Sequence, residues 1–178
     1  MQRGTTNGFL KPEEILKQIT IGDNMSVADF GCGHGYFTIS IAKIVNQGIV
    51  YALDVVKEAL QSVESMAGLE GIKNIKTIRC NLEILGGSKL EDNSIDLIIL
   101  DILSQSQKKS EIIQEAKRVL KEDGSIILIE WINGSSFSPK QGWFVSKEQV
   151  EQLMNKEGLT LDKELEMDNQ HYGLVFKK

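Results

Sequence analysis

The 178-residue chain has few residues that hold metals or form cross-links: two cysteines and two histidines. Cys32 and Cys80 have neither the spacing of metal ligands nor that of a disulfide framework. We therefore expect no metal site, and a cytoplasmic location in which both thiols stay reduced.

Long apolar runs are also missing. No run approaches a membrane span in length, and MQRGTTNGFLKPEEIL at the N-terminus lacks the apolar block of a signal peptide. The net charge is -5 and the pI about 5.2, which argues against a nucleic-acid or anionic-membrane surface. Without internal repeats or linkers rich in Pro or Ser, residues 1–178 are expected to form one domain, with residues 1–10 as a mobile N-terminal arm.

Strand-like and helix-like segments alternate along the rest of the chain. Five apolar segments predict strands: SVADF, IVYALDV, IKTIRC, SIDLIILDIL and SIILIEW. Helices are predicted for EEILKQI after Pro12, YFTISIAKIV, KEALQSVESM, SEIIQEAKRVL and VEQLMNK. LTLDKELEM and HYGLVFKK predict a closing pair of strands.

Capping signals predict where two of these helices begin or end. Ser146 and Gln149 form a capping box at the start of VEQLMNK, and Gly158 is expected to end that helix. Gly124 is expected to end the preceding helix in the same left-handed way. The alternation as a whole predicts a parallel sheet with right-handed crossovers and an antiparallel pair at its end.

Three glycines, Gly31, Gly33 and Gly35, separate the first strand from its helix in DFGCGHGYF. Without Cβ atoms, such a loop lets a ligand touch the backbone, and the helix N-terminus that follows favours a carboxylate or phosphate. Asp54 ends the next strand, where a carboxylate can accept hydrogen bonds from both hydroxyls of a ribose. A glycine corner with an acid at this position indicates a ligand that contains a nucleoside.

A dinucleotide site is the alternative use of such a corner. Its motif is G-x-G-x-x-G, whereas this chain has G-x-G-x-G, with Tyr36 where the third glycine would stand. The chain also has no second domain to hold a hydride acceptor. A nicotinamide-dependent oxidoreductase is therefore disfavoured.

With Asp29 before the glycines and Asp54 ending the next strand, DFGCGHGYF resembles the class I S-adenosylmethionine-dependent methyltransferases. More narrowly, the chain is similar to small methyltransferase-domain proteins related to the ubiquinone and menaquinone biosynthesis C-methyltransferases. The resemblance runs from about Leu10 to the C-terminus and includes VYALDV, EDNSIDLIILDIL, EAKRVLKEDGSIILIEW and HYGLVFKK. It implies an α/β fold: a Rossmann-like, doubly wound, seven-stranded mixed sheet with an antiparallel last strand and helices on both faces.

The resemblance also implies a cofactor site for S-adenosylmethionine, released as S-adenosylhomocysteine. Asp54 would hold the ribose, Val55 would pack on the adenine, and the methionine part would meet Asp29, Gly31, Gly33 and Gly35. Where the family usually has an Asp followed by a small or apolar residue, this chain has Asn81 and Leu82. The Asn81 amide oxygen can still accept from the adenine amino group, but more weakly than a carboxylate.

Catalytic residues should be few, because methyl transfer depends mainly on alignment and the exclusion of water. The candidates at the carboxyl ends of strands are Asp101, His171 and Tyr172; for Asp101, capping of the following turn is an equal alternative. The aromatic side chains Phe137, Trp143 and Phe144 lie in the loop after the fifth strand, which favours a planar or apolar acceptor.

The expected function is S-adenosylmethionine-dependent methyl transfer to carbon, oxygen or nitrogen of a small-molecule acceptor. The alternative is a catalytically silent protein that binds the cofactor and acts through partners. Because the loop after the fifth strand is short, we expect an open site or one completed by a second copy in a homodimer.

Overall fold

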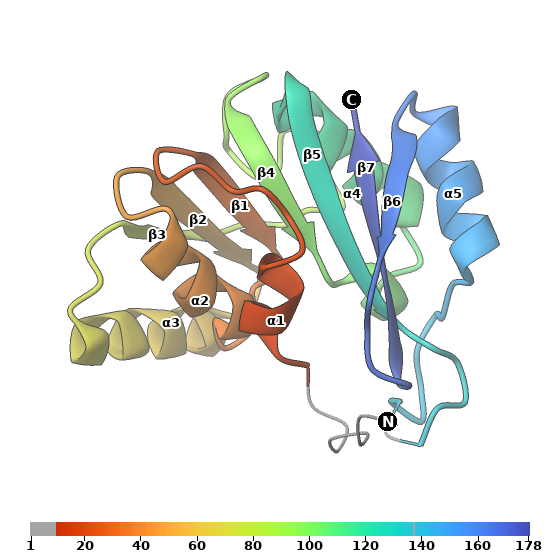
Figure 1. Ribbon diagram of the computed structural model, residues 1–178, viewed down its shortest axis with the longest axis horizontal. Coiled ribbons are helices and arrows are strands. Elements are labelled where there is room, and N and C mark those ends of the chain that lie inside the picture. Colours follow the sequence, from red (N-terminus) through yellow and green to blue (C-terminus); the bar gives the residue numbers. More distant parts are fainter. Residues whose placement is uncertain (1–9, 137) are drawn as a thin grey trace.

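A computed structural model describes residues 10–136 and 138–178 and contains one seven-stranded sheet (Figure 1). The strand order is β3-β2-β1-β4-β5-β7-β6, in which β7 runs antiparallel to both of its neighbours and the first five strands are parallel. The strands are β1 (Ser26–Phe30), β2 (Ile49–Asp54), β3 (Ile75–Arg79), β4 (Ile95–Leu100), β5 (Leu120–Trp131), β6 (Thr160–Leu165) and β7 (His171–Lys177). The predicted mixed sheet with its antiparallel closing pair is confirmed.

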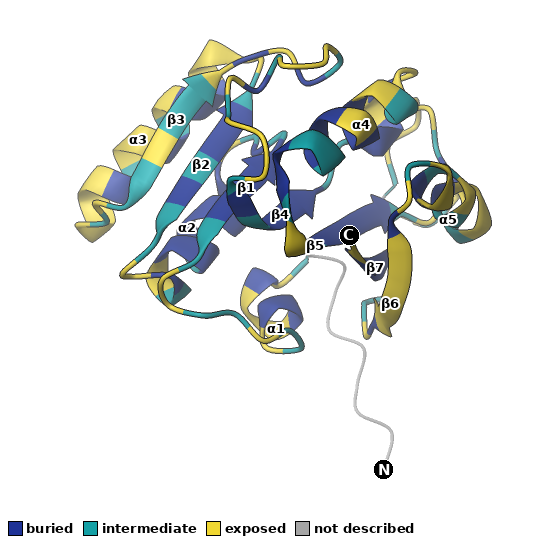
Figure 2. Ribbon diagram, turned by 90° about the horizontal axis from the view of Figure 1, so that it is seen from above, coloured by how far each residue is buried: buried dark blue, intermediate teal, exposed yellow. Residues whose placement is uncertain are grey.

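Helices cover both faces of this sheet, as predicted. They are α1 (Pro12–Leu16), α2 (Tyr36–Ile44), α3 (Lys57–Glu70), α4 (Lys109–Val119), α5 (Lys147–Lys156) and a 3-10 helix, η1 (Leu103–Gln105). Apolar side chains of α1 and α2 pack on one face, together with Val27 and Ile127, and those of α4 and α5 pack on the other, together with Phe30 and Leu128. The central strands between these layers are largely buried, whereas β3 at one edge is intermediate to exposed, and β6 at the other edge and the outer sides of the helices are exposed (Figure 2).

One predicted boundary is wrong. Helix α4 ends at Val119 and β5 begins at the next residue, Leu120. Gly124, expected to end the helix, therefore lies inside the strand. Ile95 of β4 pairs with Leu120, but Leu97 pairs with Ser125, so the residues between them form a bulge in β5. A Cβ on Gly124 would lie 2.7 Å from Cδ1 of Leu120, so the glycine permits this close approach of the chain to itself.

The capping signals of α5 are confirmed. The Ser146 hydroxyl accepts from the Gln149 N–H at 3.3 Å, and the Gln149 side chain accepts from the Ser146 N–H at 3.0 Å. Gly158 follows the helix with a left-handed φ of 77°. Residues 1–9 of the predicted N-terminal arm lie outside the described residues; the carbonyl of Leu10 accepts a hydrogen bond from the Tyr36 hydroxyl.

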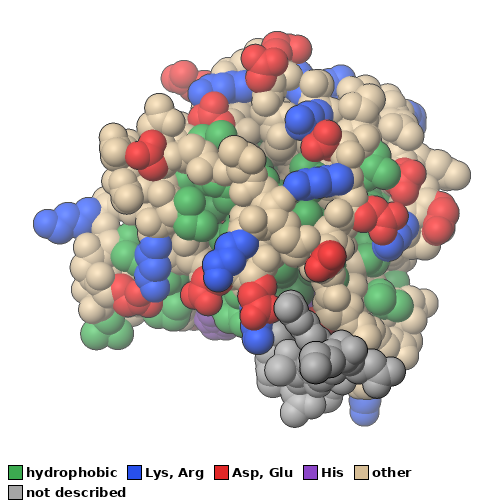
Figure 3. Space-filling model, viewed as in Figure 1, with side chains coloured by type: hydrophobic (Ala, Val, Ile, Leu, Met, Phe, Trp, Pro, Cys, Tyr) green, Lys and Arg blue, Asp and Glu red, His purple; other side chains and the backbone are tan. Residues whose placement is uncertain are grey.

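Within the described residues, no helix combines the length and apolar character that a membrane span requires. On the face seen in Figure 3, Lys and Arg side chains are interspersed with Asp and Glu rather than gathered into a patch of one sign. This mixture agrees with the small negative net charge of the chain.

Candidate functional site

The glycine corner joins β1 to α2 at the carboxyl end of the sheet. The N–H groups of Gly31 and Cys32 both donate to the carbonyl of Leu53, at 2.9 and 3.0 Å, which ties the loop to β2. Gly31 has a φ of 78°, and a Cβ there would lie 2.7 Å from Cδ1 of Ile102. The corner therefore needs glycine at this position for both backbone and packing reasons.

Asp54, at the end of β2, holds the same loop from the other side. One carboxylate oxygen accepts from the Gly33 N–H at 2.9 Å, and the other accepts from the Val56 N–H at 2.8 Å. A carboxylate has about four acceptor positions, so two remain for hydroxyl groups of a ligand. The residue predicted to hold a ribose is thus already oriented by the glycine loop.

A cavity of about 480 Å³ opens beside this corner. Six of the eight predicted cofactor residues line it: Gly31, Gly33, Asp54, Val55, Asn81 and Leu82. The side chain of Val55 is exposed and offers an apolar surface, whereas Leu82 belongs to the core. The Asn81 side-chain oxygen accepts from the Glu83 N–H at 2.9 Å and keeps one further acceptor position.

Asp29 and Gly35 are not among the residues that line this cavity. Asp29 is buried and accepts from the Thr38 hydroxyl of α2 at 2.5 Å. Burial raises the pKa of Asp29 to about 6, although the Thr38 hydrogen bond opposes the rise. Gly35 begins α2 with a φ of 87°, and a Cβ there would lie 2.8 Å from Cγ2 of Val63, so it allows α2 and α3 to pack.

Two further acids lie at the carboxyl ends of β4 and β5. Asp101 directly follows β4, and burial, then the charges of Glu130 and Asp29, raise its pKa to about 8. Glu130 is fully buried, and one of its oxygens accepts from the Ser104 N–H at 3.1 Å. Its other oxygen has no partner among the described residues, and burial raises the pKa of Glu130 as well.

His171 and Tyr172 begin β7, at the same end of the sheet, but adjacent strand residues point to opposite faces. The Tyr172 hydroxyl is buried and donates to the carbonyl of Val145 at 2.8 Å, so the structure gives it a packing role and does not support the predicted catalytic role. His171 packs on Trp131, with ring centroids 4.0 Å apart, and its Nδ1 lies 2.9 Å from the Asp168 carboxylate.

A second cavity, of about 730 Å³, lies beyond η1 at the end of β5. Its walls are mainly aromatic and amide side chains, namely Ser104, Gln105, Trp131, Pro139, Gln141, Gly142, Trp143 and Phe144. Gln105 lines this cavity and also the one at the glycine corner. The predicted aromatic residues Trp143 and Phe144 therefore lie at a cavity, whereas Phe137 falls outside the described residues.

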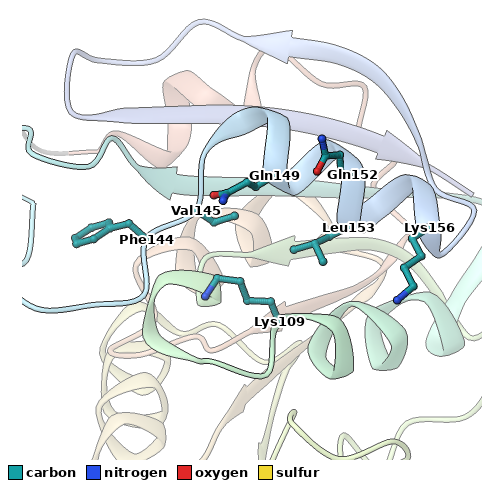
Figure 4. A pocket seen from close by; sticks show the side chains of 7 residues that line it. All are labelled: Lys109, Phe144, Val145, Gln149, Gln152, Leu153 and Lys156. Carbon is teal, nitrogen blue, oxygen red and sulfur yellow. The ribbon is translucent and has the colours of Figure 1, made fainter.

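A third cavity, of about 390 Å³, separates the start of α4 from α5 (Figure 4). Lys109 and Lys156 border it, and Leu153 forms part of its apolar wall. The Lys109 ammonium donates to the carbonyl of Ser106 at 2.6 Å. None of the predicted cofactor or catalytic residues lines this cavity, whereas Phe144 lines both this cavity and the aromatic one.

Sequence reasoning missed several residues that line the corner cavity, among them Glu83, Gln105 and Ser106. They lie in the segments after β3 and β4, Gln105 at the end of η1, and the Ser106 hydroxyl donates to Glu83 at 2.6 Å. No motif marks them. Their only signal in the sequence is that they follow strands whose carboxyl ends meet at the same edge.

The sheet order and the acid beside the glycine corner define the chain as a Rossmann-like α/β protein of the nucleoside-binding type. A methyltransferase-domain family model matches residues 21–174, so the chain belongs to that family. It is a class I methyltransferase, the class that takes its methyl group from S-adenosylmethionine.

Solved structures confirm this fold. An S-adenosylmethionine-dependent methyltransferase from Aquifex aeolicus is 23% identical, with a TM-score of 0.83 over 93% of this chain and 88% of that one. The geranyl diphosphate C-methyltransferase from Streptomyces coelicolor A3(2) is 11% identical, with a TM-score of 0.76 over 93% and 78%. The cyclase SpnF is 18% identical, with a TM-score of 0.75 over 86% and 57%. No curated protein sequence matches the chain.

Proposed function

We propose that this chain transfers a methyl group from S-adenosylmethionine to a small, planar acceptor. The observation that carries the proposal is the corner cavity, in which the Gly33 N–H orients the Asp54 carboxylate beside Gly31. Asp54 would bind the ribose, Val55 and Leu82 would pack on the adenine, and Asn81 would accept from its amino group. The donor supplies a methyl group on a sulfonium, whose positive charge is lost on transfer.

The residues present fit such a donor. The remaining acceptor positions of Asp54 match a pair of hydroxyls, and the exposed apolar surface of Val55 lies at the same cavity. Asp29 would support the corner indirectly, through its hydrogen bond with Thr38 of α2. Gly31, Gly33 and Gly35 would shape the loop that receives the methionine part.

The acceptor would occupy the aromatic cavity next to η1, which Gln105 joins to the donor cavity. Asp101 and His171 are the polar groups proposed to face the reaction. Trp131 and Trp143 favour a planar ring over a flexible chain. The proposed relation to the ubiquinone and menaquinone methyltransferases agrees with such a ring and rests on the sequence motifs.

The test is calorimetric titration of S-adenosylmethionine and S-adenosylhomocysteine into the wild type and Asp54→Ala. Loss of hydrogen bonds to a charged group should weaken binding by about 1.5–3 kcal/mol, or roughly 10- to 150-fold. Asp162→Ala, which removes an acid from exposed β6, is the matched control and should bind as the wild type does. Thermal melts of each variant verify that the fold is retained, since Asp54 also holds the loop.

No binding to the wild type would disprove the proposal. Binding without methyl transfer into a metabolite extract, followed with a radiolabelled methyl group, would favour the alternative of a catalytically silent cofactor-binding protein. The fold alone does not separate the two, because SpnF, a cyclase, shares it.

A further inference from the structure

The third cavity, between the start of α4 and α5, has hydrogen-bond donors but no carboxylate in its walls (Figure 4). Lys109 and Lys156 line it, none of its other lining residues is Asp or Glu, and we call it the lysine cavity. Neither ammonium forms an ion pair with a carboxylate among the described residues. In a chain whose net charge is -5, two such positive charges at one cavity attract anions locally.

The capping box of α5 fixes which end of the Gln149 amide is free. The side-chain oxygen accepts from the Ser146 N–H at 3.0 Å, which identifies it as the oxygen because a backbone N–H can only donate. The amide nitrogen keeps two N–H donors, and they have no hydrogen-bond partner among the described residues. Because Gln149 lines the lysine cavity, it adds donors to this cavity and not an acceptor.

Lys109 relates the lysine cavity to the proposed reaction site. Its ammonium donates to the carbonyl of Ser106 at 2.6 Å, which orients the side chain and leaves two N–H groups for a ligand. Burial lowers the pKa of Lys109, and the negative charge of Glu130 opposes this change. Glu130 directly precedes Trp131 of the aromatic cavity at the end of β5, so Lys109 lies near the edge of the sheet at which the acceptor would react.

The three cavities form a row in which neighbouring cavities share a residue. Gln105 lines the donor and aromatic cavities, and Phe144 lines the aromatic and lysine cavities. In Figure 4, the ammonium end of Lys109 is directed toward the side of the lysine cavity at which Phe144 and Val145 lie. Apolar side chains therefore lie between the aromatic cavity and the first positive charge, and Lys156 borders the other side of the lysine cavity.

We propose that the lysine cavity binds an anionic group of the methyl acceptor, a carboxylate or a phosphate, while the ring of the acceptor occupies the aromatic cavity. This inference rests on the proposed function. The anion accepts hydrogen bonds from the Lys109 ammonium and the Gln149 amide, and Lys156 adds a second positive charge. Phe144 and Val145 contact the chain that joins the ring to the anion. The acceptor is thus an amphipathic acid with a planar ring.

The walls of the lysine cavity disfavour other occupants. Both lysines would repel a cationic group, and an uncharged polar group forms weaker hydrogen bonds with the same donors than an anion does. A nucleic acid binds through many phosphate contacts, whereas this cavity has two lysines and the chain as a whole is negative. Val145 and Leu153 in the same walls favour a ligand with apolar atoms next to its anion. A small amphipathic anion meets all of these conditions.

Intrinsic fluorescence reports on the aromatic cavity, because the two tryptophans of the chain, Trp131 and Trp143, both line it. The probes are 4-phenylbutanoate, 3-phenylpropyl phosphate and, as the uncharged control, 4-phenylbutanamide. Each is titrated by calorimetry and by fluorescence into the protein saturated with S-adenosylhomocysteine. At least one of the two acids should bind about tenfold more tightly than the amide and change the fluorescence, and its advantage should shrink as salt is added. The tighter of the two acids identifies the anionic group.

Variants then locate the anion. Gln149→Glu keeps the acceptor of the capping box but replaces the free donors with a negative oxygen, so it should weaken binding of the tighter acid about tenfold or more and leave the amide unchanged. Lys109→Gln should act in the same way, whereas Lys156→Gln, at an exposed charge, should weaken the acid by about two- to fivefold. Lys73→Gln, which changes an exposed lysine between α3 and β3, is the matched control and should bind every probe as the wild type does. Thermal melts verify that each variant is folded.

Each outcome has a distinct meaning. If S-adenosylhomocysteine does not bind by calorimetry, the proposed function is wrong, whatever the acids do. If it binds but neither acid does, or the amide binds as tightly as both acids, the anionic acceptor is overturned. The same holds if Gln149→Glu and Lys109→Gln bind the acids as the wild type does. Acids that bind by calorimetry without changing the fluorescence would place the ring outside the aromatic cavity, which also overturns the proposal.

Discussion

The loop between β3 and β4, which forms one wall of the corner cavity, is held by a buried carboxylate. Glu115 of α4 is fully buried and accepts from the N–H groups of Gly86 and Ser88, at 2.6 and 2.9 Å. Arg118 donates to both of its oxygens, at 2.9 and 2.7 Å, and also pairs with Asp92. Burial raises the pKa of Glu115, but these hydrogen bonds outweigh burial and lower it from 4.5 to about 2.

This shift converts into stability. With a pKa of about 2 in the folded protein against 4.5 in the unfolded chain, Glu115 stabilises the protein by about 3.4 kcal/mol at pH 7. Because the folded pKa is the lower one, the contribution is complete well above pH 4.5 and is lost as the pH falls toward 2. At pH 3 about 1.4 kcal/mol should remain.

Urea unfolding of the wild type and Glu115→Gln tests this reasoning. The difference in unfolding free energy between the two should shrink by about 2 kcal/mol from pH 7 to pH 3. Asp92→Asn is the matched control: it removes the exposed partner of the same arginine and should cost less than about 1 kcal/mol at either pH. A Glu115→Gln difference that is the same at both pH values would refute the assignment of an ionised, hydrogen-bonded Glu115.

Two further predictions concern residues of the predicted site. Gly31→Ala places a Cβ 2.7 Å from Ile102 and should weaken S-adenosylhomocysteine binding at least tenfold by calorimetry. The control is Gly71→Ala, after α3 and away from the cavity, where a Cβ meets no atom within 4 Å; it should cost only the left-handed backbone strain of about 1–2 kcal/mol in stability. Equal loss of binding in both would contradict the packing argument. Tyr172→Phe should lower the unfolding free energy by about 1 kcal/mol through the lost hydrogen bond and leave kcat for methyl transfer unchanged; a tenfold fall in kcat would restore Tyr172 as a catalytic candidate.

The sequence predicted elements whose signals are local. The alternation of apolar segments predicted the sheet and its antiparallel closing pair, and the Ser146 to Gln149 box predicted the start of α5. Gly124 misled because a glycine after a helical pattern is typical of a helix end, whereas here it permits a bulge in β5. The two cases differ only in the pairing with β4, which lies far away in the sequence.

Some residues of the candidate site could likewise be predicted from the sequence, and others could not. Gly31 and Asp54 could be paired from their places at the ends of two successive strands, and the structure brings them to one cavity. His171 and Tyr172 are adjacent in sequence, yet strand geometry turns them to opposite faces of the sheet. Only the structure shows that the Tyr172 hydroxyl already donates a hydrogen bond to the carbonyl of Val145.

By itself, the sequence determined the class of fold, the glycine corner and the acid that faces it, because chain periodicity and the freedom of glycine act over a few residues. Only the tertiary structure decided which polar atoms are buried and which lack a partner. Among the described residues, Nε2 of His171 and one oxygen of Glu130 have no hydrogen-bond partner, because β7 pairs with β5 and η1 packs over the end of β5. Such contacts join segments far apart in the chain, and no local pattern records them.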